Sequence, residues 1–176
     1  METRLSYKHA VQTAESILAN TGYQVPVDVE RIAEAHAVSV VKQDLEDSVS
    51  GVLVIKDDTG IIGVNSNHHP NRQRFTVAHE LGHFLLHPDA GRVFVDRSPV
   101  FFRDGMSSEG TSQQEIEANA FAAALLMPEA ELKRLLDDHP VDAFDEMSVR
   151  RLAARLGVSA QALTIRLTRL GLVSEF

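Results

Sequence analysis

The five residues His79-Glu80-Leu81-Gly82-His83 constrain this chain more than any other part of its sequence. Residues four apart on an α-helix lie one turn apart on the same face, so His79 and His83 can bind one metal ion. Glu80 directly follows the first histidine and can reach a water on that ion. A surface helix that carries two histidines by chance is the alternative interpretation. The motif predicts the core of a zinc-dependent hydrolase.

The composition limits the ligands that such a site can use. The chain has 176 residues and no cysteine, which excludes disulfide bonds and thiolate ligands, so histidines and carboxylates must hold any metal. With 44% hydrophobic and 24% charged residues, it is typical of one globular domain with a small appendage. Charged residues interrupt the N-terminus, and no apolar run approaches the roughly 20 residues that cross a bilayer. We therefore expect a cytoplasmic protein without membrane contact.

Hydrophobic periodicity predicts an α+β fold, with helices around a small, mostly antiparallel sheet. We expect helices at 8–19, 28–36, 70–87, 113–127 and 129–137, and strands at 38–41, 52–55 and 61–64. Gly82 costs about 1 kcal/mol relative to Ala inside a helix, and we interpret it as room for another helix to approach. Residues 88–112 are long for a loop, so we expect partial order or a flap near the site. Residues 137–147 are expected to form a linker.

The C-terminal segment 148–170 differs from the rest of the chain in charge. The whole chain has a net charge of −8, but this segment has no acid and contains Arg150, Arg151, Arg155, Arg166 and Arg169. Two predicted helices, 148–156 and 159–170, have a spacing typical of a helix-turn-helix. The segment could bind DNA phosphates, dock a protein or pack on the rest of the chain. No aromatic or amide cluster at the start of the second helix indicates base recognition, which favours packing or docking.

A catalytic zinc takes three protein ligands, so one more must come from elsewhere in the chain. The predicted helix 113–127 offers Glu115 and Glu117 beside a run of small residues, which would let two helices pack closely. Glu115 lies four residues before Asn119, which could accept a hydrogen bond from a ligand imidazole and fix its orientation. This pairing favours Glu115 as the third ligand, with Glu117 as the alternative.

The remaining histidines are expected to have other roles. His87 lies two helical turns beyond His79, which is about 12 Å and too far for a shared ion. It could support a ligand from behind or place positive charge at the C-terminus of the helix. His68, His69 and His139 have no partner at a useful spacing, so we expect them at the surface.

The chemistry of such a site follows from its residues. Zinc would polarise a scissile carbonyl and acidify a water, and Glu80 would take the proton and pass it to the leaving amine. A second group would help to hold the oxyanion. The sequence does not single it out, and the candidates are Tyr7, Tyr23, Arg72, Arg74 and a loop histidine.

Several separate segments resemble, in the right order, the ImmA/IrrE family of metallopeptidases. Residues 72–87 resemble the zinc-site helix of that family, and 115–122 resemble its third-ligand helix, followed by Leu125-Leu126-Met127-Pro128. Ser50-Gly51-Val52 and Val64-Asn65 match its hairpin. Because several segments match together, the resemblance is more specific than the pentapeptide.

The resemblance covers about residues 24–170 and implies a zincin-like fold. On this basis we expect a metallopeptidase domain at 1–130, a helix and linker at 131–147, and a helix-turn-helix-like segment at 148–176. Longer members carry a further sensor-like domain after that segment. This chain stops at Phe176, so we expect any activating signal to come from elsewhere.

The resemblance also implies a function. By likeness, His79, His83 and Glu115 are the ligands of Zn²⁺, with Mn²⁺ as an alternative, and Glu80 is catalytic. Members of the family typically cleave an intracellular helix-turn-helix repressor, in the induction of prophages or mobile elements or in a stress response. We therefore expect an endopeptidase with a repressor as its protein substrate. The alternative is a non-catalytic regulatory or antitoxin-like binding protein with a structural or vestigial metal site, which an intact Glu80 disfavours.

Overall fold

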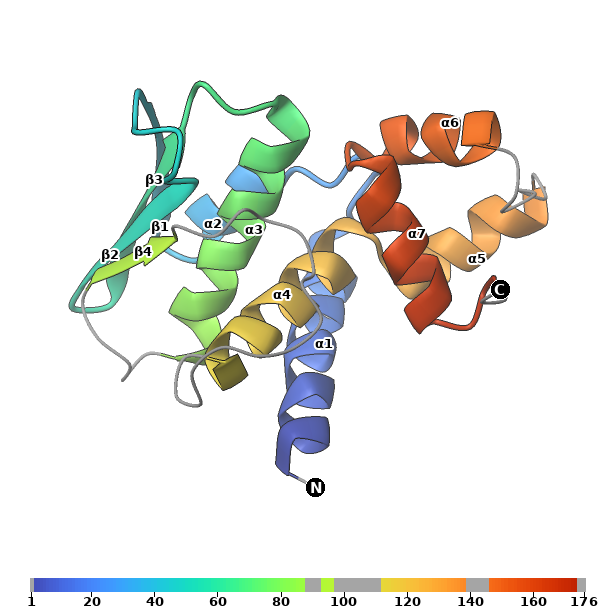
Figure 1. Ribbon diagram of the computed structural model, residues 1–176. Coiled ribbons are helices and arrows are strands. Elements are labelled where there is room, and N and C mark those ends of the chain that lie inside the picture. Colours follow the sequence, from blue (N-terminus) through green and yellow to red (C-terminus); the bar gives the residue numbers. More distant parts are fainter. Residues whose placement is uncertain (1, 88–92, 97–111, 139–145, 174–176) are drawn as a thin grey trace.

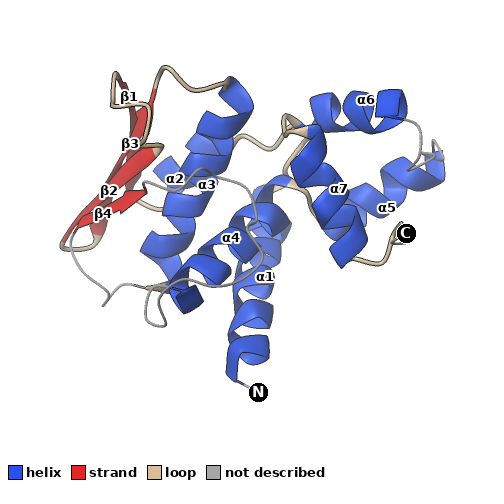
Figure 2. Ribbon diagram, viewed as in Figure 1, coloured by secondary structure: helices blue, strands red, loops and turns tan. Residues whose placement is uncertain are grey.

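The computed structural model describes residues 2–87, 93–96, 112–138 and 146–173, which form seven helices and four strands in an α+β fold. In chain order the elements are α1 (Glu2–Thr21), α2 (Val29–Ala35), β1 (Val38–Gln43), β2 (Gly51–Lys56), β3 (Thr59–Asn65), α3 (Pro70–Leu86), β4 (Val93–Asp96), α4 (Ser112–Leu126), α5 (Glu129–Asp138), α6 (Glu146–Leu156) and α7 (Ala160–Arg169). The sheet lies at one end of the molecule, α1, α3 and α4 lie in the middle, and α5–α7 lie at the other end (Figure 1). The strands thus gather on one side of the helices (Figure 2).

The four strands form one mixed sheet in the order β1-β3-β2-β4. Strand β2 pairs antiparallel with β3, with Leu53 opposite Ile62, and antiparallel with β4, with Leu53 opposite Phe94. Strand β1 runs parallel to β3, with Val40 opposite Ile62. Two of these three pairings are antiparallel, which confirms the expectation of a mostly antiparallel sheet.

One face of the sheet is covered and the other is open. Leu53 and Ile62 are fully buried, whereas Val54 and Ile61, which face each other across β2 and β3, are 40% and 52% exposed. This alternation is the two-residue period of a strand with one face against a core. The helices lie on the covered side, with α3 across the middle of the sheet (Figure 1).

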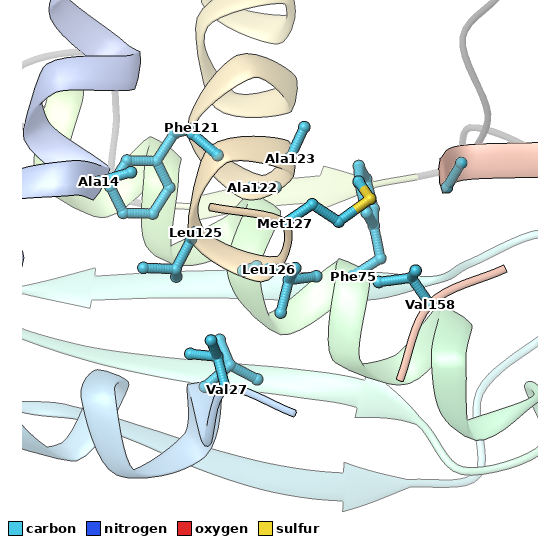
Figure 3. Close-up of a cluster of buried hydrophobic side chains, with 14 of the residues drawn as sticks. Ala14, Val27, Phe75, Phe121, Ala122, Ala123, Leu125, Leu126, Met127 and Val158 are labelled. Atoms are coloured by element: carbon cyan, nitrogen blue, oxygen red, sulfur yellow. The ribbon is translucent and has the colours of Figure 1, made fainter. Parts of the chain in front are cut away.

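Helices α3 and α4 cross in close contact at Gly82. A Cβ atom at this position would lie 3.1 Å from Phe121 Cδ1 and 3.2 Å from Ala118 Cα. The close approach of another helix, predicted from a glycine in mid-helix, is therefore confirmed. Figure 3 shows the adjoining core, in which Phe121, Leu125 and Met127 pack with residues of α1, α3 and the C-terminal segment.

The helices α6 and α7 share this core through fully buried leucines, among them Leu156 and Leu163. Arg166 of α7 is only 2% exposed, and its Nε donates a hydrogen bond to the carbonyl oxygen of Met127 at 3.3 Å. Of the five arginines in this segment, Arg166 therefore serves a buried contact within the fold. The turn of the pair is also held, because Asn71 Nδ2 donates to the carbonyl oxygen of Val158 at 2.8 Å.

Two local expectations differ from the structure. Helix α1 begins at Glu2 and not near residue 8, and its first turns are held by Gln113 of α4, whose Nε2 donates to Ser6 Oγ. Strand β4 lies inside the stretch 88–112, for which we expected partial order or a flap but no particular strand; its β-branched and aromatic residues pair with β2. Residues 88–92 and 97–111 of that stretch, and most of the expected linker 137–147, lie outside the described residues.

Helix α2 spans Val29–Ala35, within the range 28–36 expected for it. Asp28 caps this helix by accepting a hydrogen bond from the backbone N–H of Arg31. Among the described residues, no helix has the length and apolar character needed to span a bilayer.

Candidate metal centre

Helix α3 places two histidines on one face. The side chain of His69 caps the helix by accepting from the N–H of Asn71, and Pro70 occupies its first turn. The uninterrupted helix then brings the rings of His79 and His83 one turn apart, with centroids 4.7 Å from each other. Both Nε2 atoms point at the same place, since they lie 3.1 Å apart.

Glu115, in the first turn of α4, completes a cluster with these two rings. Its Oε2 lies 3.2 Å from His79 Nε2, and its Oε1 lies 3.2 Å from His83 Nε2. One ligand atom from each of the three residues can be chosen so that all lie within 4.8 Å of one another. The tight contact between α3 and α4 at Gly82 makes this convergence from two helices feasible.

The spacing of these atoms fits a small divalent ion. A tetrahedral ion with ligand bonds of about 2.0–2.2 Å places its ligand atoms about 3.3–3.6 Å apart. The observed separations of 3.1–3.2 Å are within a few tenths of an ångström of that spacing. Two imidazole nitrogens and one carboxylate are also a donor set that zinc and manganese accept.

The burial and the charges of these three side chains favour metal binding. The side chains of His79 and His83 are 6% and 3% exposed, and that of Glu115 is 44% exposed. Burial lowers the pKa of His83, which favours its neutral ring. Burial raises the pKa of Glu115, but hydrogen bonds from the two histidines outweigh it and hold that pKa well below its ordinary value. A neutral imidazole beside an ionised carboxylate is the protonation state that binds a metal.

Glu80 lies on the neighbouring face of α3 and is 1% exposed. Its Oε1 is 3.6 Å from the position that a Cβ atom would occupy at Gly51, the first residue of β2. The carboxylate is therefore enclosed between the helix and the sheet, one residue away from His79 in the chain.

Glu117, the alternative third ligand, faces a different partner. Its Oε2 lies 3.6 Å from His87 Nε2, and its Oε1 accepts a hydrogen bond of 2.7 Å from Gln113 Nε2. The ring of His87 lies 5.6 Å from that of His83, so the pair of His87 and Glu117 lies directly behind the His-His-Glu cluster. The supporting place expected for His87 agrees with this geometry. The hydrogen bond expected between Asn119 and a ligand imidazole stays a prediction.

The candidates for holding an oxyanion have other partners. Arg74 Nη2 donates to the carbonyl oxygen of Val27 at 2.7 Å, Tyr7 lies beside Arg166, and Tyr23 lies beside Glu131. These three residues therefore serve contacts within the fold.

Of the four named candidates, Arg72 has a partner beside Glu80, because its Nη2 donates to Ser50 Oγ at 2.8 Å. Among the loop histidines, Nε2 of His68 lies 3.2 Å from the carbonyl oxygen of Asp47, and His69 caps α3. His139 lies outside the described residues.

Together, the α+β fold and a His-His-Glu cluster with an adjacent glutamate define a candidate divalent-metal centre of the kind that metallopeptidases use. Residues 33–168 match the family model Peptidase_M78, described as the IrrE N-terminal-like domain. The chain therefore belongs to the ImmA/IrrE family, as its sequence motifs indicate.

Two curated relatives are similar over part of their length. The "Uncharacterized immunity region protein 2" of Bacillus phage phi105 is 32% identical over 92 residues, which are 52% of this chain and 53% of the phage protein. The "Radiation response metalloprotease IrrE" of Deinococcus radiodurans is 35% identical over 109 residues, which are 61% of this chain and 30% of that protein. The match thus spans about half of one relative and less than a third of the other.

A solved structure resembles the fold over nearly all of this chain. It is a Mycobacterium tuberculosis transcriptional regulator with a TM-score of 0.63 and 20% sequence identity. The similarity covers 95% of this chain and 50% of that one. At this identity it supports the fold alone.

Proposed function

We propose that this chain is a metal-dependent endopeptidase with a zincin-like fold. In this proposal His79, His83 and Glu115 hold Zn²⁺ or Mn²⁺, and Glu80 is the catalytic residue. The observation that carries it is the convergence of three ligand atoms from two helices, with a buried carboxylate next to the first ligand. Membership of a peptidase family supports the same assignment.

In the proposed reaction, the bound metal and Glu80 have different roles. The bound metal would supply a Lewis acid that polarises the scissile carbonyl and acidifies a water. Glu80 takes one proton from the attacking water as the new C–O bond forms. The carboxyl group then gives this proton to the leaving nitrogen as the C–N bond breaks, which leaves a carboxylic acid and an amine. Enclosure of Glu80 between α3 and β2 keeps its carboxylate in one place throughout.

We propose an intracellular helix-turn-helix repressor as the substrate. The family resemblance carries this part, because members of the family typically cleave such repressors. The names of the relatives, one for a phage immunity region and one for a radiation response, fit a regulatory substrate. Cleavage would relieve repression of a mobile element or a stress response.

We also propose that residues 1–130 form the peptidase domain, 131–147 a helix and linker, and 148–176 a helix-turn-helix-like segment that packs on the domain. Burial of Arg166 and the bond from Asn71 to the turn support packing. The exposed arginines of this segment would then dock an acidic surface of the substrate, in preference to DNA; they are Arg150, Arg151, Arg155 and Arg169.

The test uses Glu80→Gln as a trap. The variant should fold, bind metal and retain its substrate without cutting it. Proteins captured by the variant would be purified and incubated with wild-type protein and Zn²⁺ or Mn²⁺. A regulator cut by wild type and not by the variant supports the peptidase. A stable partner that neither metal allows wild type to cut supports the non-catalytic binding protein instead.

A further inference from the structure

Gly51, the first residue of β2, touches α3 where a side chain could not fit. An added Cβ would overlap the Cγ2 methyl of Thr76, and it would lie 3.2 Å from the carbonyl oxygen of Gly63. The same Cβ would lie 3.6 Å from Glu80 Oε1. The backbone at Gly51 does not have a positive φ, so the requirement for glycine here is close approach and not a special conformation.

The contact is part of a row along one side of α3. Arg72, Thr76 and Glu80 are spaced by four residues and therefore lie one above another on the helix. All three face the two residues Ser50 and Gly51. Arg72 Nη2 donates to Ser50 Oγ at 2.8 Å, the Thr76 methyl abuts Gly51, and Glu80 Oε1 lies beside Gly51.

The three contacts fix the position of β2 along the axis of α3 and its distance from that helix. The Arg72 bond sets the position along the axis, because Ser50 is fully buried and its hydroxyl has a defined partner. The absence of a side chain at Gly51 sets the distance, because Thr76 and Glu80 are also buried, at 0% and 1% exposure. The wall behind the Glu80 carboxylate is therefore the strand backbone.

We propose that Gly51 is a positioning residue for Glu80. By letting β2 lie directly on α3, it holds the Glu80 carboxylate at a fixed place relative to His79 and His83. This inference rests on the proposed function, in which Glu80 is the proton-transferring group. A displacement of about 1 Å at such a group can lower a rate about 100-fold.

The experiment compares Gly51→Ala with Gly63→Ala, a glycine in the neighbouring strand. A Cβ at Gly63 would have ordinary contacts, at 3.8 Å from the carbonyl oxygen of Val52 and 3.9 Å from Gln43 Oε1. Each variant would be loaded with Co²⁺, whose visible spectrum reports on its surroundings, and with Zn²⁺ for kinetics. Glu80→Gln provides the reference spectrum for a changed carboxylate.

We expect the Co²⁺ spectrum of Gly51→Ala to shift in the direction of Glu80→Gln, while Gly63→Ala matches wild type. With Zn²⁺, kcat of Gly51→Ala should fall about 100-fold with an unchanged KM and unchanged metal affinity. The double variant Gly51→Ala/Thr76→Ser lacks the methyl that the new Cβ would overlap. It should recover part of the spectral shift and of the lost kcat, because the contact with the carbonyl oxygen of Gly63 remains.

A folded Gly51→Ala protein with wild-type spectrum and kcat would overturn the inference, and so would a folded double variant that is as impaired as Gly51→Ala alone. If Gly51→Ala does not fold, Ser50→Ala takes its place. It should give a partial shift toward the Glu80→Gln spectrum, and no shift would overturn the inference. If wild type cuts no substrate, the proposed function fails while the spectra still test the positioning.

Discussion

The Nε atom of Arg74 donates a hydrogen bond to the carbonyl oxygen of Gly157 at 3.2 Å. Arg74 belongs to α3, the helix that also carries His79 and His83, and Gly157 forms the turn between α6 and α7. A Cβ at Gly157, where φ is +66°, would lie 2.9 Å from the same Nε. The helix with the candidate ligands therefore also holds the turn of the C-terminal pair.

Loss of this link should destabilise the whole protein. Arg74→Ala removes the donors to the carbonyl oxygens of Gly157 and Val27, so we expect the free energy of unfolding to fall by about 2–4 kcal/mol. Urea denaturation measures it. Arg150→Ala is the matched control, because Arg150 and its partner Glu146 are 65% and 76% exposed, and its effect should stay within about 0.5 kcal/mol. Equal effects of the two substitutions would contradict this account.

Local chemistry predicted the helix of the site better than it predicted the tertiary contacts. Pro70 in the first turn and apolar residues at helical spacing indicate a helix at 70–87, and α3 spans Pro70–Leu86. Strand β4 was missed because it has only four residues, and the backbone hydrogen bonds that make it a strand come from its pairing with β2. The parallel pairing of β1 with β3 likewise depends on a distant partner, which periodicity does not reveal.

The same limit applies to the site. The spacing of two histidines by four residues predicts that they converge, and the structure brings Glu115 to them. The burial of Arg166 and the hydrogen bonds of Arg74 were not predicted. An arginine in an amphipathic helix is expected to be exposed unless its neighbours in space are known. A missed signal for Arg166 is its spacing of three and four residues from Leu163 and Leu170, on the apolar side of its helix.

Glu115 and Glu117 should differ sharply in their effect on metal binding. Glu115→Gln removes a carboxylate that converges with both imidazoles, so zinc affinity should fall by more than about 100-fold. Glu117→Gln changes only the group behind His87, and a loss of about 10-fold or less is expected. Competition with a chromophoric chelator measures both affinities. A larger loss for Glu117→Gln would make Glu117 the ligand.

Gly82→Ala should weaken both the fold and the metal site. Alanine is favoured over glycine in a helix by about 1 kcal/mol, but its Cβ would press on the backbone of Ala118, which cannot move aside easily. We expect a net loss of about 1–2 kcal/mol in unfolding free energy and weaker zinc binding, because α4 carries Glu115 away from α3. Calorimetry and zinc titration test this. A Gly82→Ala protein that is more stable than wild type and binds zinc equally well would contradict this prediction.

The ion pair of Glu131 gives a pH dependence that is separate from the metal site. Arg134 donates to both oxygens of Glu131, and this hydrogen bonding lowers the pKa of Glu131 from its ordinary 4.5. Because the pKa of Glu131 is lower in the folded state, the ion pair stabilises the fold at pH values above the ordinary pKa of a glutamate. This contribution is lost as the pH falls through the folded-state pKa. Glu131→Gln should therefore cost about 0.5 kcal/mol at neutral pH and nothing in strong acid. A cost that is equal at both pH values would contradict this assignment.

The most direct test of the central claim is the set of new protein N-termini that the chain creates in a lysate of its source organism. Wild type and Glu80→Gln, each loaded with Zn²⁺ or Mn²⁺ to equal occupancy, would be added to parallel samples. We predict a new N-terminus within a helix-turn-helix regulator that appears with wild type and is absent with Glu80→Gln. The same N-termini with both proteins, or none with either metal, would contradict the assignment of Glu80 as the catalytic residue of an endopeptidase.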